Sequence, residues 1–153
     1  MGLWFFDLEE TLIESWDRPV IINQSDISWF IDTHQIKEIQ IFSFAIQTDH
    51  DKAKFESLLK KRIEHAFDIK ITNVVTIEQM RAAHFKIHNL GFEDDFEFIG
   101  CVKKQGAFLS WCALHHPDAP SAALIDDTVD NITVWNRRTG QTIDFIDVAN
   151  IEQ

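Results

Sequence analysis

The stretch GLWFFDLEETLIESW, residues 2–16, carries an apolar run that ends in acidic residues. The four apolar residues Leu3–Phe6 have the length and composition of a short buried strand. Asp7 follows them directly, Glu9 comes two residues later, and Thr11 two beyond that. The presence of several carboxylates directly after a buried strand, close to the N-terminus, requires a chemical explanation.

Length and composition are those of one globular domain that covers residues 1–153. Thirteen Phe and five Trp supply a bulky core. No apolar run approaches the length of a bilayer span and no signal peptide is visible, so we expect no membrane association. Cys101 and Cys112 have no metal-binding or redox spacing, which fits a reducing, cytoplasmic location.

The formal charge of −11 restricts the partners of the chain. A surface this acidic repels a phosphate backbone, so binding of long nucleic acid is not expected. A small phosphorylated substrate remains compatible with this charge, provided that a metal ion or a lysine supplies a local positive centre.

Strand-like and helix-like segments alternate along the chain. Strands or extended segments are predicted at residues 3–6, 38–46, 69–75, 96–102, 121–127 and 142–148. Helices are predicted at residues 25–34, 51–67, 76–91 and 103–117, and a small hairpin or flap at 17–24. The alternation predicts an α/β fold with a parallel sheet covered on both faces.

In open sheets of this kind, the functional crevice lies beyond the carboxyl ends of the strands. Asp7 follows the first predicted strand, Ser43 lies near the end of the second, and Asp126 and Asp127 end a later one. We therefore expect these residues to meet at one edge of the sheet. Carboxylates so close together need a cation between them or a shared proton. Oxygen ligands suit Mg²⁺, with Asp7 and Asp126 as the natural pair.

Groups of these kinds can process a phosphate ester. A carboxylate can attack phosphorus and form an aspartyl-phosphate. A neighbouring carboxyl group can protonate the leaving oxygen and later activate water. A serine hydroxyl and a lysine ammonium would hold the phosphoryl oxygens.

The segments FFDLEETL, IFSF, KK and LIDD occur in the order of the motifs of the haloacid dehalogenase-like (HAD) phosphohydrolases. The chain resembles this family over nearly its whole length. The resemblance implies a Rossmann-like three-layer sandwich and a Mg²⁺-dependent phosphatase. It also implies that Asp7 is the nucleophile, that Glu9 is the general acid and base with a carbonyl that binds Mg²⁺, and that Ser43 binds phosphate.

The resemblance assigns the remaining roles to a lysine and an acid pair. Lys103 or Lys104, with Lys104 preferred, would stabilise the nucleophile and the phosphoryl group. Asp126 would complete the metal site, with Asp127 beside it. Taken singly, each of these residues has an ordinary interpretation as a helix cap, a turn residue or a solvated lysine, and Ser43 as a small strand residue.

The first motif departs from the family pattern. It reads D-L-E-E-T where the family has D-x-D-G-T, so Glu9 is one methylene longer than the usual Asp, and Glu10 replaces a Gly. The alternative to a phosphatase is therefore an HAD-like binding or regulatory protein that has kept the fold and the metal but has little turnover.

The spacing of the motifs leaves no room for a separate cap domain. An uncapped site would admit a phosphorylated macromolecule as well as a small phosphometabolite or nucleotide. A partner protomer could supply the missing cover, so a homodimer is one possibility. His84 and His88 are four residues apart on a predicted helix but lack a third metal ligand, and we interpret them as surface or helix-face residues.

Overall fold

The computed structural model describes residues 2–151, in which a central, mostly parallel six-stranded sheet has the order β3-β2-β1-β4-β6-β5. The strands are β1 (Leu3–Phe6), β2 (Glu38–Phe42), β3 (Lys70–Val75), β4 (Ser121–Asp126), β5 (Ile132–Trp135) and β6 (Thr142–Asp147). All neighbouring strands pair in parallel except β5, which runs antiparallel to β6 at the edge. The fold class predicted from the sequence, α/β with a mostly parallel sheet, is confirmed.

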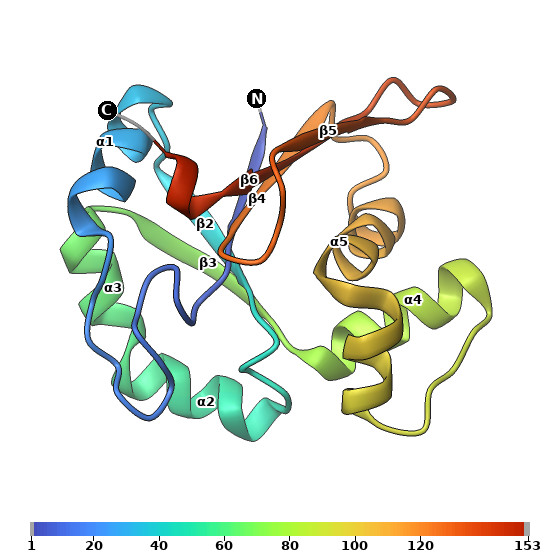
Figure 1. The fold of residues 1–153 in the computed structure, drawn as a ribbon, viewed down its shortest axis with the longest axis horizontal. Helices are drawn as coiled ribbons and strands as arrows, with labels where there is room; N and C mark the ends of the chain where they lie inside the picture. Colours follow the sequence, from blue (N-terminus) through green and yellow to red (C-terminus); the bar gives the residue numbers. More distant parts are fainter. Residues whose placement is uncertain (1, 152–153) are drawn as a thin grey trace.

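Helices flank both faces of this sheet (Figure 1). One face is covered by α1 (Gln24–Thr33), α2 (Asp49–Leu58) and α3 (Lys60–Phe67), and the other by α4 (Ile77–His88) and α5 (Asp95–His115). A short 3₁₀ helix, η1 (Val148–Asn150), follows β6. The arrangement is compatible with a Rossmann-like three-layer fold. None of the helices within residues 2–151 has the combination of length and apolarity that a bilayer span requires.

The two adjacent phenylalanines of β1 explain why this strand is apolar throughout. Phe6 belongs to the apolar cluster under α1–α3, and Phe5 belongs to the cluster under α4 and α5. Both side chains are fully buried. Because successive residues of a strand point to opposite faces, a strand covered on both faces must be apolar at every position.

Two of the predicted helices and strands differ from those in the structure, and one strand was not predicted. The segment 96–102 is helical rather than extended, because Asp94 caps a helix through its contact with the amide of Glu97, 2.8 Å away. The long helix predicted at 51–67 is two helices that break at Leu59. The antiparallel strand β5 was not predicted, since its residues are largely exposed and give no clear alternation.

Helix α5 contains a kink at Lys103 that defines where Lys104 lies. Lys103 has φ 62° and ψ 175°, a backbone conformation that is otherwise almost restricted to glycine. Its side chain is exposed, whereas the side chain of Lys104 is buried. The kink therefore separates two neighbouring lysines and turns only the second into the protein.

We expect Lys103→Gly to raise the free energy of unfolding by about 1 kcal/mol, because glycine relieves the strain at this position. The measurement is urea unfolding of the variant and the wild type. Gln105→Gly is the matched control: it places glycine in regular helix and should lower stability by about 1 kcal/mol. A loss of stability in both variants would show that the Lys103 backbone is not strained.

Candidate functional site

Asp7 and Asp126 lie side by side at the carboxyl end of the sheet. They follow or end the paired strands β1 and β4, and the Asp7 amide donates a 2.9 Å hydrogen bond to the Ile125 carbonyl. From β1 the chain first builds β2 and β3 on one side and later places β4 on the other. The two aspartates therefore flank the point where the strand order reverses, which is where α/β sheets form ligand sites.

Lys104 joins these two carboxylates. Its Nζ lies 3.0 Å from Asp7 Oδ1 and 2.9 Å from Asp126 Oδ2. The Lys104 side chain is only 8% exposed, and its ammonium lies 4.6 Å from the centroid of the Phe44 ring. The attraction between a buried ammonium and two buried carboxylates offsets part of the cost of desolvating the three charges. Of the two lysines proposed from the sequence, the structure places Lys104 in the site.

The second oxygen of Asp126 is fixed by Thr128. The amide and the hydroxyl of Thr128 donate to Asp126 Oδ1 over 2.8 and 2.9 Å. These bonds orient the carboxylate, so that Oδ2 faces Lys104 and has no hydrogen bond beyond that ion pair within residues 2–151. Thr128 is not among the site residues expected from the sequence, although an aspartate commonly accepts a hydrogen bond from the backbone amide two residues later.

A third carboxyl group, that of Asp127, completes the cluster. Oxygens of Asp7, Asp126 and Asp127 all lie within 4.8 Å of one another. Burial raises the pKa of Asp127 to about 8, and hydrogen bonds to Glu10 and Asp7 and the charges of Asp7 and Asp126 act in the same direction. A carboxyl group that keeps its proton near neutral pH reduces the repulsion within the cluster.

The other charged groups of the cluster are shifted by burial and by each other. Burial raises the pKa of Asp7, and Asp126 adds to this effect, while Lys104 opposes it. Burial also disfavours the ionised form of Asp126, but the Lys104 ammonium and the hydrogen bonds from Thr128 outweigh it, and its pKa is lowered. For Lys104, burial is outweighed by Asp7 and Asp126, so its pKa is raised. Lys104 therefore stays charged.

Glu9 and Glu10 follow Asp7 in a tight loop. The Glu9 carboxylate accepts a 2.6 Å hydrogen bond from the Trp16 amide, and this bond ties the start of the loop to its far side. Glu10 adopts φ 59°, the left-handed conformation that glycine adopts at low cost. Its carboxylate lies in hydrogen-bonding reach of Asp127. Glu10 thus forms the left-handed turn of the loop and adds an acidic group at the site.

Ser43 lies at the end of β2 on the same side of the sheet. It is 1% exposed, and its Oγ accepts a 3.2 Å hydrogen bond from the Ala45 amide. Ser43 and the acidic cluster line the same cavity, which has a volume of about 370 Å³. Its lining contains all the predicted site residues except Lys103: Asp7, Glu9, Ser43, Lys104, Asp126 and Asp127, with Glu10, Glu14, Ser15, Phe44, Ala45 and Thr128.

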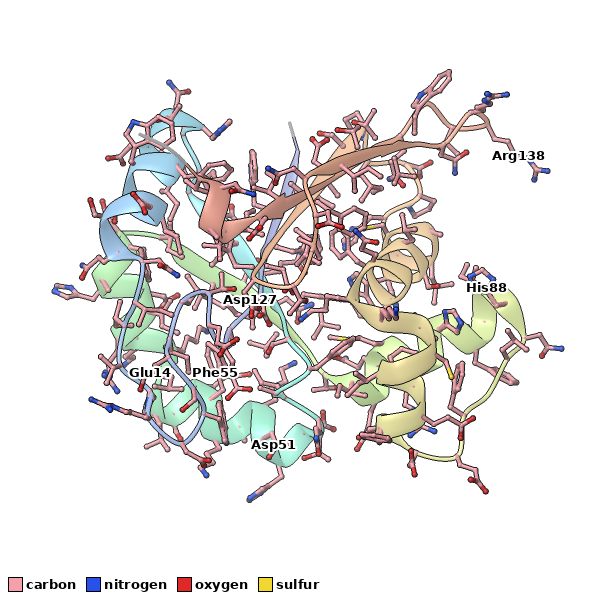
Figure 2. The ribbon with its side chains drawn as sticks, in the orientation of Figure 1. Glu14, Asp51, Phe55, His88, Asp127 and Arg138 are labelled. Atoms are coloured by element: carbon pink, nitrogen blue, oxygen red, sulfur yellow. The ribbon has the colours of Figure 1, made fainter. Side chains whose placement is uncertain are left out.

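Figure 2 labels two residues of the cavity lining, Glu14 and Asp127. Asp127 lies near the middle of the view, at the end of the sheet, and Glu14 lies on the loop that follows β1. Glu14 forms a 3.1 Å ion pair with Arg18, and both side chains are at least half exposed. Backbone hydrogen bonds close this loop, for example from the Glu14 amide to the Val20 carbonyl at 2.9 Å. The loop therefore forms a wall of the cavity rather than a separate cap.

The sequence predicts surface or helix-face positions for His84 and His88. His88 is exposed, and His84 lies on the face of α4 that packs against α5. His84 is 8% exposed, and its Nδ1 lies 2.8 Å from Ser110 Oγ. Its ring centroid lies 4.5 Å from that of His88. Burial lowers the pKa of His84, and His88 lowers it further, so the ring is a neutral packing residue.

Comparison of the chain with family models, with curated proteins and with solved structures found no match in any of the three. The function must therefore be argued from the geometry of the cavity.

Proposed function

We propose that the chain is a Mg²⁺-dependent phosphomonoesterase of the HAD-like type, which works through an aspartyl-phosphate on Asp7. One observation carries the proposal: Lys104 bridges Asp7 and Asp126 at the floor of a cavity, over distances of 3.0 and 2.9 Å. A nucleophilic carboxylate, a fixed ammonium and a second carboxylate at one strand edge are the parts that phosphoryl transfer needs. The resemblance of the sequence motifs to those of the HAD phosphohydrolases also supports this proposal.

The side chains at the cavity floor fit a hard divalent cation. The donors are oxygens alone, which suits Mg²⁺ better than zinc or copper. The buried Asp126 Oδ2 has no hydrogen-bond partner within residues 2–151 besides its ion pair, and Thr128 already orients the carboxylate. Asp7, Asp126 and the Glu9 carbonyl would hold the ion, with Asp127 beside them. When bound, Mg²⁺ supplies positive charge that attracts the phosphate and favours ionised Asp7.

The residues of the chain would then act in two steps. Asp7 attacks phosphorus, the bond to the ester oxygen breaks, and Glu9 gives its proton to the leaving alcohol. Glu9 next takes a proton from a water molecule, whose oxygen attacks the phosphorus and releases phosphate and free Asp7. Ser43 and Lys104 hold the phosphoryl oxygens during both steps.

Hydrolysis of para-nitrophenyl phosphate tests this function. We expect phosphate release with Mg²⁺ and almost none after the metal is removed with a chelator and the protein is returned to metal-free buffer. Restoration of activity by Mg²⁺ shows that the chelator did not unfold the protein. Equal rates with and without the metal would contradict the proposal.

The second candidate is a binding protein with little turnover. The hydrogen bond between Glu9 and the Trp16 amide favours it, since a restrained carboxylate moves protons less readily. Such a protein would bind Mg²⁺ and a phosphate ester but would release no phosphate.

Release of phosphate by the wild type distinguishes the two candidates, and variants of Glu9 then test the proton transfer. We expect Glu9→Gln to lower the turnover of one phosphomonoester by about 10²- to 10⁴-fold, the usual contribution of general acid–base catalysis. Glu9→Asp retains the carboxyl group but displaces it by about 1 Å, which can cost on the order of a hundredfold. The measurement is turnover of the three proteins at fixed Mg²⁺. If Glu9→Gln is as active as the wild type, Glu9 is not the proton donor.

A further inference from the structure

One side of the molecule carries most of its exposed apolar side chains. Ten large apolar residues within residues 2–151 are exposed, and seven of them belong to α4, α5, β5 or the segment between α4 and α5. These seven are Phe85, Ile87, Leu90, Phe96, Leu109, Ile132 and Trp135. Phe96 is 86% exposed. Trp135 points to the opposite face of β5, because its neighbour Val134 packs against the cluster under α4 and α5, so six of the ten lie on this side. A concentration of this kind on one side indicates an interaction surface.

This side also carries two patches of opposite charge. The acidic corner, residues 91–97, reads GFEDDFE and contains the exposed acids Glu93, Asp94 and Glu97 around Phe96. The basic tip, residues 136–140, is the turn of the β5–β6 hairpin and contains Arg137 and Arg138. Neither arginine pairs with a carboxylate within residues 2–151, and both are exposed.

The basic tip is a preorganised structure rather than a loose loop. The Asn136 carbonyl accepts a 2.8 Å hydrogen bond from the Gly140 amide, and Asn136 Oδ1 accepts a 2.9 Å bond from the Arg138 amide. Gln141 anchors the base of the hairpin through bonds of 2.7 and 2.8 Å to the carbonyls of His116 and Ala119. Figure 2 shows Arg138 at the end of this hairpin, pointing away from the rest of the protein. The backbone of the tip is therefore ordered before binding, so that ordering on contact with an acidic partner is confined to the two arginine side chains.

We infer that this side binds a second copy of the same chain, with the basic tip of each copy on the acidic corner of the other. In the view of Figure 1 the hairpin projects at the upper right, and the segment between α4 and α5 lies at the lower right. In a twofold dimer, a contact between the basic tip of one copy and the acidic corner of the other is repeated by symmetry with the roles of the two copies exchanged. One twofold axis therefore satisfies both charge contacts, as a closed symmetric dimer requires.

The surface between the two patches supplies an apolar centre for this dimer. A groove of about 540 Å³ lies between α4, α5 and the hairpin, and its lining includes Ile87, Leu109 and Val134. A stable interface buries about 800 Å² on each partner, roughly a tenth of the 8681 Å² surface of this chain. Two charge contacts at the ends and an apolar groove between them match the polar rim and apolar core of such interfaces.

A charge-swap experiment tests this dimer by sedimentation velocity over a wide range of protein concentration. The wild type should dimerise, and high salt should weaken the dimer because its end contacts are between charges. Arg137→Glu/Arg138→Glu makes the tip acidic, and Glu93→Lys/Glu97→Lys makes the corner basic. In a homodimer of either variant, the tip and the corner that face each other carry charges of the same sign at both contacts. This repulsion should raise the dimer dissociation constant about a hundredfold or more.

The mixture of the two variants gives the decisive result. An acidic tip then meets a basic corner, and the basic tip of the other copy meets an acidic corner, so a heterodimer should form with close to wild-type affinity. The control variant Lys61→Glu/Lys70→Glu changes the net charge as much as the tip variant does, but on exposed residues of α3 and β3, and should dimerise like the wild type. A monomeric wild type, or a mixture that stays monomeric, would overturn the inference.

Discussion

Asp7→Asn is expected to abolish phosphatase activity, with a loss of roughly 10⁴-fold or more, the scale seen when a covalent nucleophile is removed. The amide cannot attack phosphorus, although it has nearly the same shape as the carboxylate. Lys104 keeps its 2.9 Å contact with Asp126 in this variant, so the site is not left with an unpaired ammonium. The measurement is release of phosphate at saturating Mg²⁺.

The control for this variant is Asp118→Asn, an exposed aspartate in the turn before β4, at the opposite end of the strand from the site. It should keep wild-type activity. Circular dichroism of Asp7→Asn should match that of the wild type. A match would show that the variant is folded and that its activity is lost for a chemical reason. Equal turnover by Asp7→Asn and the wild type, after contaminating phosphatases are excluded, would refute covalent catalysis at Asp7.

Lys104→Met is expected to reduce both activity and stability. Loss of the ammonium leaves Asp7 and Asp126 buried without their shared cation, and breaking a buried pair of this kind costs about 3–5 kcal/mol. Turnover should fall about 10²- to 10³-fold, since one fixed donor to the phosphoryl group is lost. Saturating Mg²⁺ should recover part of the stability, because the metal places positive charge between the same carboxylates.

The matched control is Lys103→Met, the same substitution on the exposed neighbour. Its backbone remains in the same unusual conformation, and its side chain makes no ion pair within residues 2–151. Activity and urea unfolding should both remain close to those of the wild type. If the two methionine variants behave alike, the difference in burial between the two lysines has no functional meaning.

The sequence predicts much of the fold because local pattern and global packing agree. Continuous apolar runs at β1 and β4 are what a sheet covered on both faces requires, and the acids that follow them mark the carboxyl ends of the strands. Once the strands are parallel and adjacent, Asp7 and Asp126 must lie together. The candidate site could thus be assembled from strand ends alone.

Features that depend on distant contacts could not be predicted in the same way. The kink that exposes Lys103 and buries Lys104 arises inside a helix, where the sequence shows two identical residues in succession. The buried position of His84 depends on Ser110, 26 residues away on another helix. The contact between Glu9 and the Trp16 amide depends on how the loop after β1 closes. Each of these is set by tertiary structure rather than by local propensity.

We propose that Asp7 receives a phosphoryl group with the help of Mg²⁺, and beryllofluoride binding tests this role of Asp7 without knowledge of the substrate. Beryllofluoride bonds to an aspartate oxygen and imitates the aspartyl-phosphate. Fluorine NMR of the wild type should show bound beryllofluoride with Mg²⁺ and none without it, while Asp7→Asn should show none in either case. Binding that is equal in Asp7→Asn, or absent from the wild type with Mg²⁺, would contradict the assignment of Asp7 as the phosphate acceptor.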